Sequence, residues 1–526
     1  MRIERAARWI WIGCLGAALA GAQQQGATPA AGEQKPGTAA THMTAEQAQQ
    51  LFALVDELIQ FSSTETGLQV KSAVKRRLTT RDEVEKYLDE KFSEDQSAKR
   101  LQQNEIVLRK FGLLDRDFEL KPFLVALLKE QIEAYYDPKT KTVNLLDWVS
   151  AEEQKPVMAH ELTHALQDQY ADLEKWDNQT PEEVSTTASA DTDHVARDEM
   201  DSARDAVTEG QATAVMVDYV LKPMGKSLVK DPEVLDAFKE QMSGSDSPVM
   251  ARAPLLLSES MLFPYRDGLS FEQDVWMDKG RDAAFAGTLT RPPRSSWEIL
   301  NPREYEKQHM PAVPLMPNIH PLVDGLYKPL DIGQVGQLDV EILSQLMGGE
   351  RMSRDLTPAW DGGIYWAGQL KSAKSAAEKA NTRSLALFYL SAWKSPASAQ
   401  LFASLYADNL GRKYSDVKVL AGVDTSIGTA GGVEQRFSTS EGPVVITTRG
   451  KLVFVSESFE LPLARRLTAL VLDAQGVGEE RLAKVGVGPE QDRAAGALGL
   501  SGDLVRLMES AGVTKAAVEA ALRSAH

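Results

Sequence analysis

The pentapeptide His160-Glu161-Leu162-Thr163-His164 combines the residue types that hold and use a zinc ion. On a helix, side chains four positions apart lie on one face, so both imidazoles can reach one ion at about 2.0–2.1 Å. Glu161 lies beside that face, where its carboxylate can take a proton from metal-bound water. Zinc lowers the pKa of such a water to about 7, which supplies hydroxide for attack on a carbonyl carbon. The alternative is a helix with two surface histidines and no metal.

A catalytic zinc site usually has three protein ligands, and the third ligand identifies the class of site. A metzincin would need glycine at position 167 and histidine at position 170. The chain has Gln167 and Tyr170 at these positions, which excludes that class.

A glutamate on a second helix is the remaining common arrangement. Glu209 offers such a ligand on a helix that the apolar spacing predicts over residues 199–221. Gly210, the next residue, would allow the backbones of the two ligand helices to approach closely. Asp205 and Glu199 compete with Glu209 for this role, and a solvated carboxylate on an acidic helix is the alternative interpretation of Glu209.

Hydrolysis of a peptide bond also needs a hydrogen-bond donor for the developing oxyanion, usually a His or Tyr side chain. Tyr265 is the first candidate, followed by Tyr305, His309 and His194. A tyrosine that only packs in the core is an equally common arrangement, so the sequence leaves this role open.

Two further carboxylates are candidates for orienting the ligands. Asp168 follows His164 by one helical turn, where it can accept a hydrogen bond from an imidazole. An exposed carboxylate is the equally common alternative. Asp205 is a candidate for the same supporting role when it is not itself the third ligand.

Local patterns predict a mainly helical region around the motif. Thr44 and Gln47 form a capping-box pattern before apolar residues at helical spacing, which predicts the first helix of a helical part over 44–130. A turn-forming tetrapeptide, Asp137-Pro138-Lys139-Thr140, separates two strand-like runs at 131–136 and 142–146. This arrangement predicts a β-hairpin.

The remaining part of the first region is expected to alternate helices and loops. The motif lies on a helix predicted over 157–170, followed by a Ser/Thr/Asp-rich loop over 177–198. Residues 264–305 are expected to form turns and short helices.

A proline-rich stretch between 311 and 321 predicts a domain boundary. Beyond it, a possible ββαββα order follows from strand patterns at 364–370, 385–393, 444–448 and 452–456 and helical patterns at 398–410 and 461–472. We therefore expect an α+β chain. It would have a mainly helical domain with a small sheet over 44–320, a smaller α+β domain over 321–475, and an Ala/Gly-rich helical tail over 476–526.

The decapeptide from His160 to Gln169 resembles the motif of exported bacterial zinc metallopeptidases of the gluzincin type, most of them uncharacterised. The similarity covers roughly residues 44–310. It includes Tyr135-Tyr136-Asp137-Pro138 with Asn144-Leu145-Leu146, Glu209-Gly210, Phe263-Pro264-Tyr265 with Gly268, and the run 291–296.

The resemblance implies a zincin-like fold with one Zn²⁺ ion. His160, His164 and Glu209 would be the ligands and Glu161 the general base. It also implies that the strand 142–146 is the sheet edge that pairs with an extended substrate backbone.

The charge balance and the cysteine content limit the partners. With 58 basic and 75 acidic residues the chain has a net charge of −17, which repels phosphate backbones and argues against nucleic-acid binding. Cys14 is the only cysteine, so an intramolecular disulfide and a thiolate zinc cage are excluded.

The N-terminal residues have the pattern of a secretory signal. Three arginines precede an apolar stretch over 9–20, and Ala20-Gly21-Ala22 is a typical cleavage site. We expect a signal peptide over 1–22, a disordered linker over 23–43, and a secreted or periplasmic mature protein without a membrane-spanning segment. Lipid attachment at Cys14 is the less favoured alternative, because Trp11 fits a lipobox poorly.

The leading hypothesis from these patterns is an exported zinc peptidase that acts on a peptide or protein substrate. A catalytically silent zinc-binding scaffold or partner-binding protein on the same fold is the main alternative. A zinc hydrolase that acts on a non-peptide amide is the third.

Overall fold

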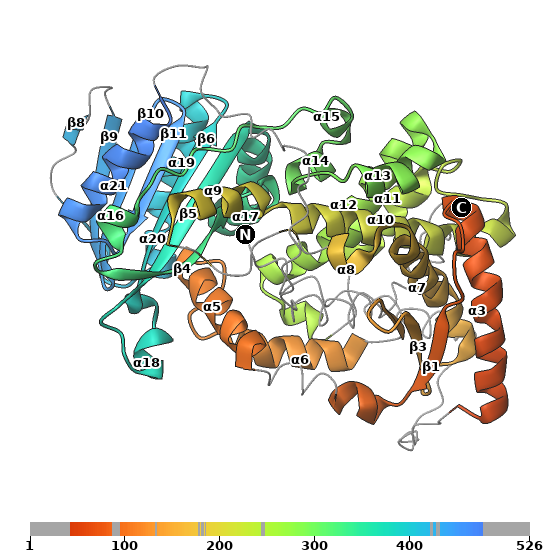
Figure 1. Ribbon diagram of the computed structural model, residues 1–526. Coiled ribbons are helices and arrows are strands. Elements are labelled where there is room, and N and C mark those ends of the chain that lie inside the picture. The colour runs from red at the N-terminus through yellow and green to blue at the C-terminus, as the bar shows by residue number, and fades with distance from the viewer. Residues whose placement is uncertain are drawn as a thin grey trace, which may run out of the picture.

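The computed structural model describes residues 43–86, 95–131, 134–176, 179, 184, 186–243, 248–420, 424–427 and 432–476. The expected signal peptide lies outside these residues, as do the linker up to residue 42 and the tail from residue 477. The fold is α+β, as expected. A helical region with a small sheet lies at one end of the molecule and a larger antiparallel sheet at the other (Figure 1).

The helical region begins at the predicted capping box. Helix α3 (Ala45–Thr66) starts after Thr44, whose side chain accepts a hydrogen bond from the Gln47 backbone N–H, while the Gln47 side chain accepts one from the Thr44 N–H. The apolar side of α3 packs against α7, the helix that carries the His-Glu-x-x-His motif. The other elements of this region are α5 (Asp95–Phe111), α6 (Leu120–Gln131), α7 (Ala151–Ala171), α8 (Leu173–Trp176), α9 (Ala188–Arg197), α10 (Met200–Leu221), α11 (Glu233–Ser243), α12 (Leu255–Lys279), a π-helical turn (Ala283–Gly287), α13 (Thr288–Thr290), α14 (Ser296–Leu300) and α15 (Pro302–Glu306).

The small sheet contains the predicted hairpin, formed by β2 (Ala134–Asp137) and β3 (Thr142–Leu146). A third strand, β1 (Lys75–Thr79), pairs with β3 in parallel, so the strand order is β1-β3-β2. The expectation that residues 142–146 form the sheet edge is therefore wrong, because β3 is paired on both sides. The edge strands are β1 and β2.

Helix α7 begins earlier than predicted, with Pro156 inside it. The amide of Gln154 explains the early start: it accepts a hydrogen bond from Leu146 N–H and donates to the carbonyls of Leu146 and Val149. These bonds attach the first turns of α7 to the end of β3, so the hairpin sets the direction of the motif helix.

Two segments that were expected to be irregular are helical. Helix α9 lies within the expected loop 177–198, because Asp191, His194 and Val195 form a buried side that the acidic composition conceals. Helix α12 extends through Pro264 and Gly268, two residues that usually favour a turn. The close approach of α10 to α12 explains why a glycine lies at position 268.

That approach depends on two facing glycines. A Cβ atom on Gly268 would lie 2.1 Å from the Ala206 carbonyl oxygen, and one on Gly210 would lie 2.4 Å from the backbone of Gly268. The sequence pattern suggested that Gly210 lets the two candidate ligand helices approach closely. The structure shows instead that it brings α10 against α12.

The larger sheet consists of antiparallel strands in the order β4-β5-β6-β11-β10-β9-β7, with β8 paired to β9. Its elements are β4 (Tyr327–Gln334), α17 (Gln337–Leu356), β5 (Trp360–Leu370), α18 (Ala376–Lys379), β6 (Leu385–Trp393), α19 (Pro396–Asp408), α20 (Leu410–Lys413), β7 (Lys418–Val419), β8 (Asp424–Ile427), β9 (Gly432–Thr439), β10 (Gly442–Arg449), β11 (Leu452–Glu457) and α21 (Leu461–Ala474), with α16 (His320–Val323) before β4. All four predicted strands and both predicted helices are present. The suggested ββαββα order is wrong, because β4, β7, β8 and β9 were missed.

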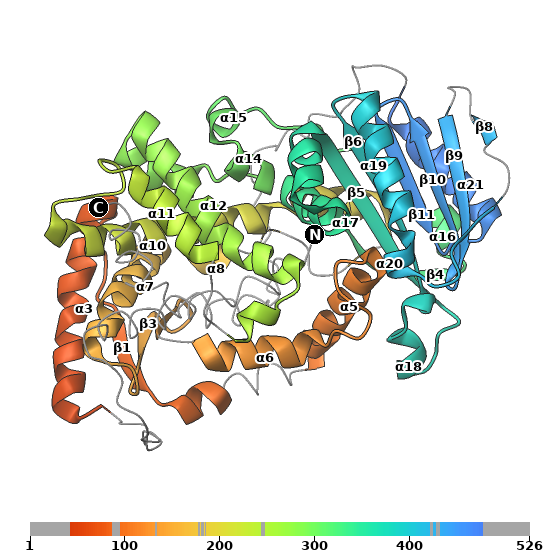
Figure 2. The ribbon, with the colours of Figure 1, turned by 180° about the vertical axis from the view of Figure 1, so that it is seen from behind.

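Helices cover both faces of this sheet (Figure 2). Alternate side chains of β5 and β6 point to opposite faces: Trp366 and Phe388 pack toward α21, and Tyr365 and Tyr389 pack toward the helical region. Phe111 at the end of α5 contacts both tyrosine rings edge-on.

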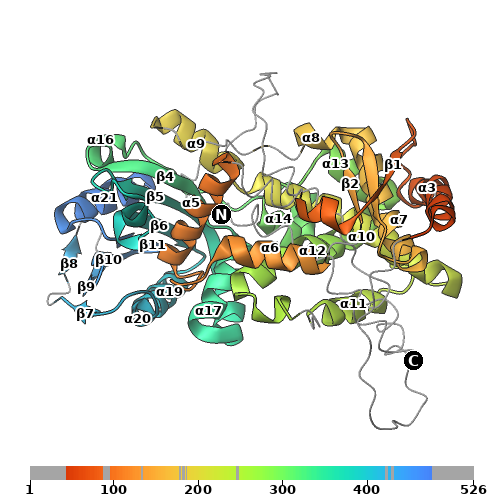
Figure 3. The same cartoon turned by 90° about the horizontal axis from the view of Figure 1, so that it is seen from below.

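Helix α5 of the helical region lies beside the larger sheet (Figure 3), and a buried ion pair attaches it there. Lys110 Nζ of α5 lies 2.9 Å from Glu441 Oε2, and neither side chain is more than 2% exposed. Behind it, Lys413 Nζ lies 2.5 Å from Glu457 Oε1. Removing one partner of such a pair leaves a buried charge, so the Lys110–Glu441 pair holds α5 against the sheet, while the Lys413–Glu457 pair joins α20 to β11. Among the described residues, no helix combines the length and the apolar character needed to cross a membrane.

Gly268→Ala should lower the free energy of unfolding by about 1–3 kcal/mol, because the added methyl group separates α10 from α12. Urea denaturation measures the change. Gly411→Ala is the control, since nothing lies within 4 Å of a Cβ at that helical position. Equal stability of Gly268→Ala and the wild type would contradict the close contact.

Candidate metal centre

Two helices bring three ligand side chains together. His160 and His164 project from one face of α7, one turn apart, and Glu209 projects toward them from α10. The Nε2 atoms of the two histidines are 3.0 Å apart. Glu209 Oε2 lies 3.1 Å from His160 Nε2, and Glu209 Oε1 lies 3.6 Å from His164 Nε2. Within the part of the chain that the structure describes, this is the one such group able to hold a metal ion.

The spacing of these atoms fits a tetrahedral ion. Ligands that bind zinc at about 2.0–2.1 Å in a tetrahedron are about 3.3 Å apart. The observed separations of 3.0, 3.1 and 3.6 Å surround that value. Two imidazoles and one carboxylate also match the ligand set of catalytic zinc sites that keep a fourth position for water or substrate.

The electrostatics of the group also favour a cation. His160, His164 and Glu209 are each no more than 3% exposed. Burial raises the pKa of Glu209, but the charge and hydrogen bonds of His164 and His160 lower it further, to about 2. The carboxylate therefore stays ionised inside the protein, where a negative charge is stable only beside a positive one.

Glu161, the expected general base, lies on the side of α7 that faces the small sheet. Its Oε2 atom accepts a hydrogen bond of 2.8 Å from the backbone N–H of Tyr136 in β2, and the side chain is fully buried. This bond holds the carboxylate between the motif helix and the outer side of β2. The edge strand nearest to the expected base is therefore β2.

Tyr265 of α12 lies beside the ligands. Its ring stacks on the imidazole of His160, with centroids 6.3 Å apart and an angle of 24° between the planes. This position keeps Tyr265 as the first candidate for the oxyanion donor.

The other candidates for the oxyanion donor are engaged elsewhere. The Tyr305 hydroxyl donates to the Arg291 carbonyl, and His309 is exposed and bonded to Glu304. His194 is buried on α9, which packs against β4 of the larger sheet.

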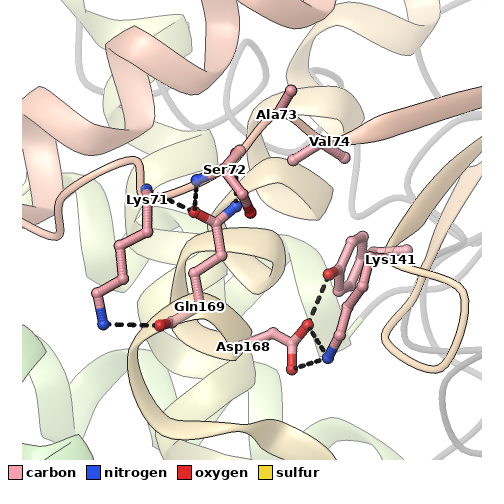
Figure 4. A pocket seen from close by; sticks show the side chains of 8 residues that line it. Lys71, Ser72, Ala73, Val74, Lys141, Asp168 and Gln169 are labelled. Atoms are coloured by element: carbon pink, nitrogen blue, oxygen red, sulfur yellow. Dashed lines mark hydrogen bonds and ion pairs between the residues drawn. The ribbon is translucent and has the colours of Figure 1, made fainter.

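Asp168 does not have the role that we expected. It accepts a hydrogen bond of 2.6 Å from the Tyr136 hydroxyl and forms an ion pair of 2.8 Å with Lys141, so it attaches the hairpin to the end of α7. These residues line a cavity of about 240 Å³ together with Gln169 and residues 71–74. Figure 4 shows Lys71 and Lys141 on either side of Gln169 and Asp168.

The two carboxylates that competed with Glu209 lie outside the ligand group. Asp205 is buried one turn before Glu209 on α10. Glu199 accepts hydrogen bonds from the backbone and hydroxyl of Ser296 at the start of α14. Neither carboxylate contributes an atom to the group of His160, His164 and Glu209.

Gln167, which no sequence pattern singled out, takes the place beside the His164 imidazole that was expected for Asp168. Gln167 Oε1 lies 2.8 Å from His164 Nδ1, on the same face of α7. A polar side chain three positions after a ligand was the available signal, because residues at this spacing are neighbours on a helix. The sequence pattern favoured Asp168 instead, because a carboxylate is a common hydrogen-bond partner of a metal-binding histidine.

Glu272 of α12 is a second buried acid that the sequence did not reveal. It lies beside Thr288 and Gln211 and is fully buried. Burial raises the pKa of Glu272 well above its ordinary value of 4.5, and the nearby polar side chains of Thr288 and Gln211 offset only part of this shift. The side chain is therefore a neutral acid in the folded protein at moderately acidic pH.

Comparison with protein-family models, curated proteins and solved structures finds no match.

Glu272→Gln should make the protein more stable than the wild type at pH 8, with the difference vanishing below about pH 4. In the wild type, the Glu272 carboxyl group holds its proton more tightly in the folded protein than in the unfolded chain. The free energy of unfolding of the wild type therefore falls as pH rises above the ordinary glutamate pKa, and the amide variant lacks this loss. Denaturant unfolding at several pH values measures the difference. Glu57→Gln is the exposed control, and a pH-independent difference for Glu272→Gln would refute the prediction.

Proposed function

We propose that this protein is an exported zinc-dependent peptidase that hydrolyses peptide bonds with water as the nucleophile. The observation that carries the proposal is the convergence of His160, His164 and Glu209 at spacings suited to one tetrahedral ion. Glu161 lies next to the first ligand in the sequence. This combination is the gluzincin arrangement that the sequence motif resembles.

In this proposal His160, His164 and Glu209 would hold the zinc ion, which would supply an activated water and a Lewis acid for the substrate carbonyl. Glu161 accepts a proton from the attacking water and returns it to the leaving amine nitrogen. Its hydrogen bond from Tyr136 N–H orients the carboxylate for both transfers. The Tyr265 hydroxyl is the candidate donor to the oxyanion, since the Tyr265 ring stacks on His160.

We propose β2 in place of β3 as the strand that pairs with an extended substrate. Both sides of β3 are occupied by β1 and β2. The Tyr136 N–H of β2 points toward Glu161, so this strand connects the substrate edge to the general base. Tyr136 of β2 also lines a cavity, together with Lys141 and with Asp168 near the C-terminal end of α7. This cavity could receive a substrate side chain.

Export remains part of the proposal because of the signal-peptide pattern over residues 1–22. The single cysteine lies within this segment, so cleavage after Ala22 would leave a mature chain without thiols. Mass measurement of the exported protein distinguishes this cleavage from lipid attachment at Cys14.

The second candidate is a catalytically silent zinc-binding scaffold, and the burial of the centre favours it. The side chains of His160, Glu161 and Glu209 are no more than 1% exposed, whereas a protein substrate must reach the metal. A peptidase with this structure would therefore have to open before binding a substrate. Catalytic assays of a Glu161 variant separate the two candidates.

Glu161→Gln should reduce peptide hydrolysis by at least about 10²–10⁴-fold, because the amide cannot accept the proton. Zinc content should stay near one ion per chain, since the three ligands are unchanged. A quenched fluorescent peptide library measures turnover, and atomic absorption measures zinc. Full activity in this variant would rule out the proposed mechanism. Absence of turnover in the wild type with zinc bound would favour the scaffold.

The double variant His160→Ala/His164→Ala should lose bound zinc, because only one of the three proposed ligands remains. The purified chain without residues 1–22 is loaded with zinc, dialysed and assayed for metal. His309→Ala is the control, since that histidine is exposed and bonded to Glu304. Equal zinc content in the double variant and the wild type would place the metal elsewhere.

A further inference from the structure

A chain of buried amide groups leads from the π-helical turn to the proposed metal centre. The turn at Ala283–Gly287 widens the helix locally, so some of its carbonyl groups are available to other donors. Gln211 Nε2 of α10 lies 2.8 Å from the Ala284 carbonyl, 3.0 Å from the Phe285 carbonyl and 2.8 Å from Thr288 Oγ1. The side chain of Gln211 is fully buried.

These contacts determine which way the Gln211 amide faces. The Thr288 hydroxyl donates to the Ala284 carbonyl, so Thr288 Oγ1 accepts from Gln211. All three neighbours of Gln211 Nε2 are therefore acceptors. A flipped amide would put its oxygen against three oxygens, which is strongly unfavourable for buried groups. Gln211 Oε1 must then face in the other direction, toward α7.

Gln167 is oriented by the same logic. Its Nε2 atom lies 3.0 Å from Gln211 Oε1 and 2.9 Å from the Thr208 carbonyl, and both of these are acceptors. The amide nitrogen must therefore point at α10, which leaves Gln167 Oε1 facing His164 Nδ1 at 2.8 Å. An amide oxygen only accepts, so His164 Nδ1 must carry a proton.

The consequence lies at the other nitrogen of the His164 ring. A neutral imidazole with a proton on Nδ1 has its lone pair on Nε2. His164 Nε2 is the atom that lies 3.0 Å from His160 Nε2 and 3.6 Å from Glu209 Oε1. The amide chain thus selects the tautomer whose lone pair points into the ligand group.

We propose that Gln167 and Gln211 are positioning residues that fix the tautomer and ring orientation of His164 for metal binding. Gln167 acts directly on the imidazole, and Gln211 acts by fixing the Gln167 amide against the π-helical turn. The inference rests on the proposed zinc site. It adds to that site a second layer of uncharged partners where a carboxylate is more usual.

The test measures the zinc dissociation constant of the full mature chain by competition with a chelator. Gln167→Met keeps the length of the side chain and removes both hydrogen-bonding groups, so zinc should bind about 10–100-fold more weakly. Gln167→Glu keeps an acceptor for His164 Nδ1 but places an oxygen against the Thr208 carbonyl and Gln211 Oε1, so it should bind zinc more tightly than Gln167→Met and more weakly than the wild type. Gln211→Met should cause a smaller loss, because Gln167 keeps its bond to the Thr208 carbonyl.

Gln154→Met is the matched control. Gln154 is also a fully buried glutamine on α7, but its bonds go to Leu146 and Val149. This variant should unfold at lower temperature and bind zinc with unchanged affinity. An equal loss of affinity in Gln154→Met and Gln167→Met would show that the effect is structural and would overturn the proposal. Unchanged affinity in Gln167→Met would overturn it as well.

A metal-free readout separates this inference from the proposed function. If the wild type binds no zinc, the zinc site fails, and the tautomer can still be read from the nitrogen shifts of ¹⁵N-histidine-labelled protein. The spectra are recorded at about pH 9, well above the ordinary histidine pKa of about 6.5. The amide chain is supported if His164 carries its proton on Nδ1 in the wild type and if this proton moves to Nε2 in Gln167→Met. A proton on Nε2 in the wild type refutes it.

Discussion

The arrangement of this protein depends on placing one buried carboxylate against two buried imidazoles. An isolated charge is costly inside a protein, so Glu209 needs polar partners within contact distance. His160 and His164 provide them only if α7 and α10 cross at a particular depth and rotation. The same geometry is suited to a metal ion, because one divalent ion between these atoms would satisfy all three side chains together.

The surrounding elements hold α7 and α10 at the position where they cross. Gly210 and Gly268 let α10 lie directly on α12, which fixes the face that α10 turns toward α7. On the other side, Gln154 attaches α7 to the hairpin, and the Tyr136 N–H of that hairpin holds Glu161. The hydrogen bonds of the hairpin and the amide chain therefore orient Glu161 and His164 from opposite sides of the same helix.

The larger sheet contributes rigidity at a distance. Lys110 of α5 is buried against Glu441, and Phe111 packs on Tyr365 and Tyr389. Ion pairs removed from water strongly restrict geometry even when they add little net stability. The sheet and the helical region consequently share one continuous core, which reaches from α3 to the inner face of β6.

The sequence by itself determined the features that depend on local spacing. Two histidines four apart specify one helical face, Thr44 and Gln47 specify a helix start, and the alternation around Arg449-Gly450 specifies the β10–β11 hairpin. Only the tertiary structure decided which distant groups meet: Glu209 in preference to Asp205, Gln167 in preference to Asp168, and β2 as the strand beside Glu161. Periodicity records which side of an element is buried, but it does not record the rotation and depth at which two elements pack. For α10 these were set by a glycine contact with α12, a helix that Pro264 and Gly268 had concealed.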